Sequence, residues 1–268
     1  MRSQAIASEI EAAQRESCQV APFTSRYPGF DVAGAYEVAR QVHEAKLARG
    51  ERAVGRKIGF TNANIWDTYG VHAPIWGFVY QSTLSRLSPS GATFRLAGLM
   101  EPKIEPEVAI CFRDSPADGA PEEILAAVEW IAPAFEIVQT HFPGWKFRAP
   151  DTIADNGLHG ALLPGEPVPV AKLGPGAIAA LGSFALDLAR DGRTVASGTG
   201  GNVLGNPLAA IAHLCSVLEG QPQFPPVRAG DIVTTGTITT AESIGPGETW
   251  TTTVRGIGLA GLRVSFSR

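Results

Sequence analysis

The sequence predicts an α+β fold, in which a helical N-terminal part is followed by a mainly antiparallel, β-rich body. Apolar residues recur at helical spacing through roughly the first fifty positions. After Gly50, short runs of strand character alternate with glycine and proline, and only two further segments have helical periodicity. We therefore expect an N-terminal α/β part over residues 1–90 and a β-rich catalytic domain over residues 91–268.

Two helices are expected before Gly50. Ile6, Ile10 and Ala13 form an apolar stripe at helical spacing in the first of them. Asp31 is placed to cap the second helix, which continues to Gly50.

The two later helices have clear start signals. One starts at Pro121, carries acidic residues in its first turn, and has an apolar pattern that continues to Ile131. The other starts with Asn206 as its cap and Pro207 at the first helical position, and Gly220 closes it.

Nine segments read as strands, and Asp191-Gly192 between two of them is typical of a two-residue hairpin turn. The expected strands are Ala53–Phe60, Phe78–Leu84, Lys103–Phe112, Ala134–Thr140, Ser183–Ala189, Thr194–Ser197, Asp231–Thr237, Thr249–Arg255 and Gly261–Ser267.

The composition is that of an ordinary globular protein, with 268 residues, 44% hydrophobic residues and a net charge of -4. The basic residues are dispersed, which argues against a nucleic acid as partner. Cys18, Cys111 and Cys215 form no CxxC pair, so a reducing compartment is favoured. No secretory signal is visible, and no apolar stretch approaches the ~20 residues of a membrane span. We expect a soluble, cytoplasmic protein without a membrane partner.

The segment Lys103–Ile110 contains the most informative pattern. Side chains alternate between the two faces of a strand, so Glu105 and Glu107 should share one face. Two carboxylates on neighbouring positions of one face, about 7 Å apart, repel each other unless a positive charge lies between them. Pro106 lacks a backbone donor, which predicts that this strand lies at a sheet edge or a bulge.

Glu136 is a third candidate, because it interrupts the short apolar run Ala134–Val138. An unpaired glutamate is costly to bury there. Three glutamates suit the oxygen-ligand preference of Mg²⁺ or Mn²⁺, whereas zinc would be expected to recruit histidine or cysteine. A solvated acidic face remains the alternative to a metal site on this pattern alone.

Two further segments are candidates for the site. Lys57 lies in a glycine-flanked strand and could donate a proton, or balance the negative charge of an enolate; an exposed strand lysine is the alternative. The polar loop Asp151–Gly160 could form one wall of a site, with His159 as its candidate acid or base. Gly198–Gly205 does not match a phosphate-binding loop and is expected to lead into the following helix.

Seven segments in this order resemble the 2-keto-4-pentenoate hydratase / 4-oxalocrotonate decarboxylase family of the fumarylacetoacetate hydrolase superfamily. The resemblance runs from about Arg52 to the C-terminus. It is carried by Gly55-Arg56-Lys57-Ile58-Gly59, Gly70-Val71-His72-Ala73-Pro74-Ile75-Trp76-Gly77, Pro102-Lys103-Ile104-Glu105-Pro106-Glu107, Pro133-Ala134-Phe135-Glu136, Asp151-Thr152-Ile153-Ala154-Asp155-Asn156, Val203-Leu204-Gly205-Asn206-Pro207-Leu208 and Ala229-Gly230-Asp231-Ile232-Val233-Thr234-Thr235-Gly236.

The resemblance implies a fold of the fumarylacetoacetate hydrolase C-terminal type and a homo-oligomer. It implies an Mg²⁺ or Mn²⁺ ion that chelates the 1-carboxylate and 2-oxo group of a small 2-oxo acid and stabilises its enolate. The residue roles that it implies are metal ligands at Glu105, Glu107 and Glu136 and a catalytic lysine at Lys57. We further expect substrate contacts from His72, Gln81, Ser82, Asn156 and Thr235.

The sequence departs from the family pattern at three places. Gln81 and Ser82 stand where an acidic residue is common, and Gly157-Leu158-His159 replaces a serine-containing stretch. Asn206 stands where a histidine is common. His159 is our candidate for a replacement acid or base.

Four functions follow from these observations. The first is a hydratase of 2-hydroxy-2,4-dienoates in aromatic catabolism, and the second a decarboxylase of a 2-oxo-3-enedioate. A diacid would need a further cationic pocket, for which His72, Arg56 and His141 are candidates. An acylpyruvate hydrolase and a non-catalytic, ligand-binding homologue are the remaining alternatives.

Overall fold

Two long neighbouring strands, β4 (Lys103–Phe112) and β5 (Val128–Val138), organise the molecule. They pair with each other over their length in the computed structural model, which describes residues 2–63, 66–69, 71–116 and 119–268. In these residues the strands form an eight-stranded and a five-stranded sheet, with mostly antiparallel pairs. The predicted α+β class, with a mainly antiparallel body, is confirmed.

The larger sheet has the order β2-β1-β10-β4-β5-β6, with β11 paired to β4 and β7 paired to β5. The smaller sheet has the order β3-β13-β12-β8-β9. The other strands are β1 (Ala53–Gly59), β2 (Ile75–Tyr80), β3 (Ala92–Arg95), β6 (His159–Pro164), β7 (Val168–Pro169), β8 (Ala185–Arg190), β9 (Arg193–Thr199), β10 (Ile232–Thr234), β11 (Glu242–Ser243), β12 (Thr249–Arg255) and β13 (Arg263–Ser267).

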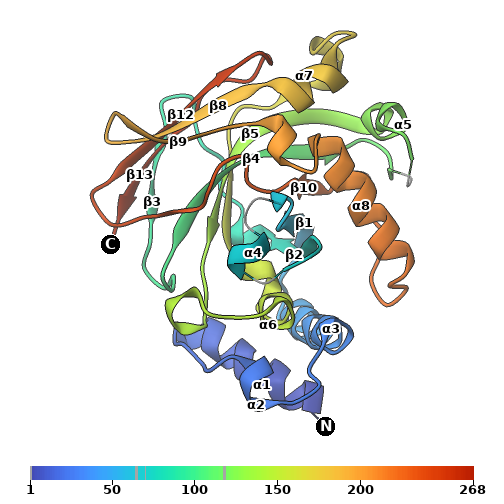
Figure 1. Ribbon diagram of the computed structural model, residues 1–268, viewed down its shortest axis with the longest axis vertical. Helices are drawn as coiled ribbons and strands as arrows, with labels where there is room; N and C mark the ends of the chain where they lie inside the picture. Colours follow the sequence, from blue (N-terminus) through green and yellow to red (C-terminus); the bar gives the residue numbers. More distant parts are fainter. Residues whose placement is uncertain (1, 64–65, 70, 117–118) are drawn as a thin grey trace.

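The N-terminal helices gather at one end of the molecule beside α6, and the two sheets, the C-terminus and the later helices α5, α7 and α8 lie beyond them (Figure 1). The helices are α1 (Arg2–Glu16), α2 (Phe23–Arg26), α3 (Val32–Ala48), α4 (Trp66–Tyr69), α5 (Pro121–Ala126), α6 (Ala149–Ala154), α7 (Ala177–Ser183) and α8 (Pro207–Glu219). The short 3₁₀ helices are η2 (Gln81–Thr83), η3 (Pro143–Trp145), η4 (Asn156–Leu158), η5 (Val170–Lys172) and η6 (Gly200–Asn202).

The predicted helix caps and the hairpin turn are confirmed. Asp31 Oδ1 accepts a hydrogen bond from the Gly34 N–H at 2.9 Å, and Asn206 Oδ1 accepts one from Leu208 N–H at 3.0 Å. Asp191 and Gly192 both have positive φ in the turn between β8 and β9, as a type I′ hairpin requires. Local sequence therefore sets these boundaries.

Several predicted boundaries are wrong, among them the end of the strand expected over Asp231–Thr237, which stops at Thr234. The helix that begins at Pro121 ends at Ala126, and Val128 already starts β5. Pairing with β4 decides this, because Ile131 opposite Ile110 fills the core from a strand. The loop Asp151–Gly160 instead contains α6 and η4, and His159 begins β6. The strand expected to start at Phe78 starts at Ile75 and ends at Tyr80.

Of the two alternatives predicted from Pro106, a sheet edge or a bulge, the edge is wrong, and the structure instead has a local interruption of the pairing. β4 lies inside the sheet, with β5 on one side and β10 and β11 on the other. Pro106 falls between the stretches that β10 and β11 cover, and its carbonyl accepts a hydrogen bond from Ile238 N–H at 2.9 Å. The missing proline donor is tolerated because the ladder is interrupted at that point.

The N-terminal part does not form a separate sheet. β1 pairs in parallel with β10 through Gly55 and Lys57, so this part of the chain extends the sheet that contains β4. The division of the chain into two domains at residue 90 stays a prediction.

The helix α8 lies in the main core. The segment Gly200–Glu219, which ends with α8, is the one described stretch whose length and composition would also suit a membrane span, so the expectation that no stretch approaches that length needs correction. Its apolar side is buried against the sheet through Leu208, Ile211 and Leu214.

Candidate metal centre and substrate cavity

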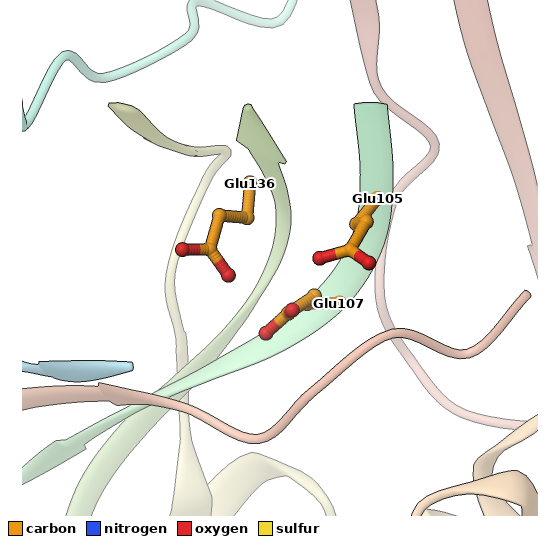
Figure 2. A group of neighbouring side chains, drawn as sticks. All are labelled: Glu105, Glu107 and Glu136. Carbon is orange, nitrogen blue, oxygen red and sulfur yellow. The ribbon is translucent and has the colours of Figure 1, made fainter. Parts of the chain in front are cut away.

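Three glutamates converge where β4 and β5 pair. Glu105 is the direct cross-strand partner of Glu136, and Glu107 lies two residues further along the same face of β4. One carboxylate oxygen from each residue lies within 4.8 Å of the other two. Figure 2 shows the carboxylates of all three directed into one space between the strands.

These carboxylates are short of positive charge. Glu107 and Glu136 are 1% and 0% exposed, and Glu107 Oε1 has no hydrogen-bond partner among the described residues. Burial, together with the neighbouring carboxylates, raises the pKa of Glu107 well above its usual value. Burial also raises the pKa of Glu105 to about 7, although Lys57 opposes the shift.

Two side chains hold Glu136. Lys57 Nζ on β1 lies 3.2 Å from Glu136 Oε2, and His159 Nδ1 lies 2.7 Å from Glu136 Oε1. Burial would raise the pKa of Glu136, but Lys57 and His159 outweigh it and lower that pKa. Burial also opposes the charge of Lys57, yet the three glutamates together raise its pKa. Lys57 is therefore held as a cation, and Glu136 as an anion.

The donor set fits a hard divalent cation. All candidate ligand atoms are carboxylate oxygens, and Glu107 Oε2 is fixed by the Gly236 N–H at 2.9 Å, which leaves Oε1 free to bind. Gly236 is required at its position, since it has a φ of +100° and an added Cβ would lie 1.8 Å from Thr61 Oγ1. The nearby His159 ring already engages Glu136 and Thr83, so it offers no free nitrogen.

A cavity of about 180 Å³ opens beside this centre. Its polar lining residues are Lys57, Glu105, Thr237 and Thr240, and Lys57 is the one cationic residue among the described residues that line it. Most of the remaining wall is apolar and is formed by Ile58, Phe60, Val138, Trp145, Phe147 and Leu158.

The segment Asn156–Leu158 closes one side of the cavity in a rare backbone conformation. Asn156, Gly157 and Leu158 have φ values of 52°, 65° and 64°, a conformation that is costly for leucine. Two hydrogen bonds of the Asn156 side chain stabilise this conformation: Oδ1 accepts from Phe78 N–H at 2.8 Å, and Nδ2 donates to the Phe78 carbonyl at 2.9 Å. The Gly157 carbonyl then accepts from Lys57 Nζ at 2.9 Å.

Of the other predicted site residues, three lie next to the centre without lining the cavity. His159 bridges Glu136 and Thr83, and Asn156 supports the loop that orients Lys57. Thr235 is fully buried, and its hydroxyl donates to the Val108 carbonyl at 3.3 Å. Each of them is placed to position another group, and their direct roles in catalysis or substrate binding stay predictions.

The structure does not bring His72, Gln81 and Ser82 to the cavity. His72 is exposed beside an apolar groove with Tyr36. Gln81 and Ser82 form an exposed turn in which the Ser82 hydroxyl donates to the Glu51 carboxylate at 2.9 Å. Gly70, from the same motif as His72, lies outside the described residues.

The two other candidates for a second cationic pocket also lie elsewhere. His141 is buried, with Nδ1 2.9 Å from both carboxylate oxygens of Asp155. Arg56 neighbours Lys57 on β1 but does not line the cavity. The structure therefore provides no second cation from these residues.

Sequence reasoning missed the aromatic wall. Trp145, the last residue of η3, and Phe147, which follows η3, line the cavity. Lys103 Nζ lies 4.0 Å from the centre of the Trp145 ring, a cation–π contact that holds the indole beside β4. Two aromatic residues shortly after Pro143-Gly144 are visible in the sequence, but only the fold shows that they line the cavity.

Characterised relatives match nearly the whole chain. A 2-hydroxyhexa-2,4-dienoate hydratase of Comamonas testosteroni is 30% identical over 94% of this chain and 93% of its own length. A 4-oxalocrotonate decarboxylase of Pseudomonas putida is 30% identical over 97% and 95%, respectively. A 2-keto-4-pentenoate hydratase of Burkholderia vietnamiensis is 31% identical over 98% and 96%.

The fold agrees with a solved relative. The 4-oxalocrotonate decarboxylase from Pseudomonas putida G7, complexed with magnesium and adipate, superposes with a TM-score of 0.89 at 26% identity, over 99% of this chain and 97% of that chain. Residues 63–265 match the family described as fumarylacetoacetate (FAA) hydrolase C-terminal. The converging glutamates thus lie within the matched region, and the chain belongs to the fumarylacetoacetate hydrolase C-terminal family.

Proposed function

We propose that this protein is a divalent-metal-dependent hydratase of a 2-hydroxy-2,4-dienoate or its 2-oxo-enoate tautomer. The observation that carries the proposal is the convergence of Glu105 with the buried Glu107 and Glu136, and Lys57 beside them in the wall of a mostly apolar cavity. Relatives at 30–31% identity that are named as dienoate and ketopentenoate hydratases support the reaction class.

We infer that the ion is Mg²⁺ or Mn²⁺, held by Glu105, Glu107 and Glu136. The oxygen-only donor set favours such hard cations. The related decarboxylase was solved with magnesium and also, at 25% identity, with calcium. When bound, the ion would polarise the carboxylate and 2-oxo group of the substrate and offset the negative charge that develops there.

Lys57 is the proton-carrying group in this proposal. Its ammonium lines the cavity and is oriented by the Gly157 carbonyl and the Glu136 carboxylate. A lysine so placed can hold or deliver a proton at the reacting chain of the substrate. Hydration then requires a proton at the far end of the diene and addition of water at the neighbouring carbon.

The wall of the cavity favours a substrate with an apolar tail. Trp145, Phe147 and Leu158 offer contact surface but no charge. A second carboxylate on the substrate would lose its hydration on entering this cavity and would find no unpaired cation in the wall, because Lys57 already pairs with Glu136. This favours a monocarboxylic dienoate over a 2-oxo-3-enedioate.

Decarboxylation of a 2-oxo-3-enedioate is the second candidate. It is supported by the solved decarboxylase, whose complex contains the diacid adipate, and by a second decarboxylase relative at 30% identity.

We also propose that the protein assembles as a homo-oligomer and is located in the cytoplasm.

Product analysis by NMR tests the proposal. The protein is incubated with Mg²⁺ and 2-hydroxypenta-2,4-dienoate, 2-oxo-3-hexenedioate or an acylpyruvate, and the products are identified; oxalate binding with and without Mg²⁺ is measured in parallel. A hydroxylated 2-oxo acid from the dienoate is expected. Release of CO₂ from the enedioate alone would favour the decarboxylase. Cleavage of an acylpyruvate would favour a hydrolase, and no turnover of any of them, despite metal-dependent oxalate binding, would indicate a non-catalytic homologue.

A further inference from the structure

Arg56 is a buried cation that has no role in the proposed reaction. Lys57 reaches the glutamates, and adjacent residues of a strand point to opposite faces, so Arg56 faces away from the metal centre toward α3. Arg56 is 2% exposed, yet it forms no ion pair with any carboxylate in the described part of the chain.

No carboxylate among the described residues contacts the guanidinium directly, and the electrostatic support that it receives from Asp231 is opposed by Arg228. The guanidinium donates to the carbonyls of Gly55 at 3.2 Å and Pro225 at 3.3 Å, and its Nε–H has no partner among the described residues. The guanidinium carbon lies 4.1 Å from the centre of the Phe78 ring, whose plane also stacks on His43 at 3.6 Å. These neutral contacts hold the group in place without balancing it.

A cavity of about 230 Å³ lies in front of this group. Arg52 and Arg228, both exposed, line it together with Arg56, and Asp231 is the one acidic residue among the described lining. Asp231 Oδ2 accepts the Arg228 N–H at 3.0 Å, so part of that carboxylate is already engaged. The pocket therefore combines three guanidinium groups with a single carboxylate.

We propose that this pocket, formed between α3, β1 and the loop that precedes β10, binds a small oxyanion such as a phosphate group. Guanidinium groups match the oxygen pairs of phosphate in geometry and charge. The anion would bridge the buried Arg56 and the exposed Arg52 and Arg228. This site lies on the other side of β1 from Lys57 and needs neither the metal nor the 2-oxo acid.

Calorimetric titration with inorganic phosphate tests the proposal, with sodium chloride at matched ionic strength as the reference. We expect saturable phosphate binding to the full chain. The variants Arg228→Ala and Arg52→Ala should each raise the Kd by about tenfold, the equivalent of one charge-assisted hydrogen bond. Arg190→Ala, which also removes one exposed positive charge but lies on β8, should leave the Kd unchanged.

Two further arms separate the outcomes. Lys57→Met should retain phosphate binding, and loss of binding in that variant would assign the anion to the metal centre and overturn the proposal. Arg56→Met should abolish binding; if it does not fold, the two exposed variants decide. An unchanged Kd in both of them, or no binding beyond the chloride reference, would also overturn it. Titration with glucose 6-phosphate distinguishes a phosphate ester from the free ion as the preferred ligand.

Discussion

At the scale of single residues, Glu136 is the candidate ligand that contacts both His159 and Lys57. Its two oxygens are engaged separately, Oε1 by His159 and Oε2 by the ammonium of Lys57. A histidine in this place orients a ligand more readily than it transfers a proton to substrate, because both ring nitrogens are occupied.

The variant His159→Ala tests this positioning role. Loss of a hydrogen bond to a ligand typically weakens metal binding by about 10–100-fold, so we expect a rise of that size in the Kd for Mn²⁺ by calorimetry. Glu105→Gln should weaken binding further, and Glu122→Gln, on the exposed start of α5, should not change it. An unaltered Mn²⁺ affinity with a displaced pH–rate profile would instead make His159 an acid or base.

Lys57→Met should lower kcat with the dienoate substrate by about 10²–10⁴-fold, the usual contribution of a positioned proton-transfer group. The substitution also removes the cation beside Glu136, so Mn²⁺ affinity is measured in parallel. If kcat stays within a few-fold of wild type, Lys57 is not the proton carrier. Lys57→Arg keeps the charge but cannot readily exchange a proton, and should recover metal binding without kcat.

Metal binding should strengthen as pH rises through about 7. Burial raises the pKa of Glu105 to about 7 and that of Glu107 well above its usual value, so protons compete with the ion at lower pH. The folding stability of the metal-free protein should instead fall as pH rises. A carboxyl group with a raised folded-state pKa contributes stability that is fully present below the unfolded value of 4.5 and is lost as pH rises toward 7. Calorimetry and denaturant titrations at several pH values check both, and a pH-independent Mn²⁺ affinity would contradict the first.

At the scale of elements, the chain uses a strained turn to connect α6 with β6. The three residues Asn156–Leu158 have positive φ, and the turn brings the Gly157 carbonyl to Lys57. An added Cβ on Gly157 would lie 2.8 Å from Lys57 Cδ, so glycine is needed for this approach.

Asn156→Ala should destabilise the folded protein by about 1–3 kcal/mol, because two hydrogen bonds to Phe78 are lost and alanine is less favourable at this φ. Chemical denaturation measures this free energy, and Gln81→Ala in the exposed turn serves as the control. A change no larger than that of the control would show that the turn does not depend on Asn156.

At the scale of the whole molecule, the site is built from segments far apart in the chain. β1 brings Lys57 into the same sheet as β4 and β5, although in sequence about fifty residues separate Lys57 from Glu105 and about eighty separate it from Glu136. The loop after β10 contributes the Gly236 N–H. Binding of an ion should therefore stabilise the fold as one unit.

Addition of Mg²⁺ at about 100 times its Kd should stabilise the protein by about 2.7 kcal/mol. This predicts a rise in Tm that calcium chloride or manganese chloride reproduces in part and sodium chloride at equal ionic strength does not. The rise should be absent in Glu107→Gln. The same rise in that variant would place the ion elsewhere.

The sequence by itself determined the fold class, the capped helices and the shared face of Glu105 and Glu107, and it made Glu136 and Lys57 candidates; their convergence with these two glutamates is tertiary. These signals are local or periodic: strand alternation puts Glu105 and Glu107 on one face, and Asp31 and Asn206 begin helices through their own backbone contacts. Only the tertiary structure decided where β5 begins, that β4 lies inside the sheet, and which side chains face the cavity. Trp145 and Phe147 reach the site, and His72 and Gln81 do not, because strand pairing and loop packing between distant segments set those positions.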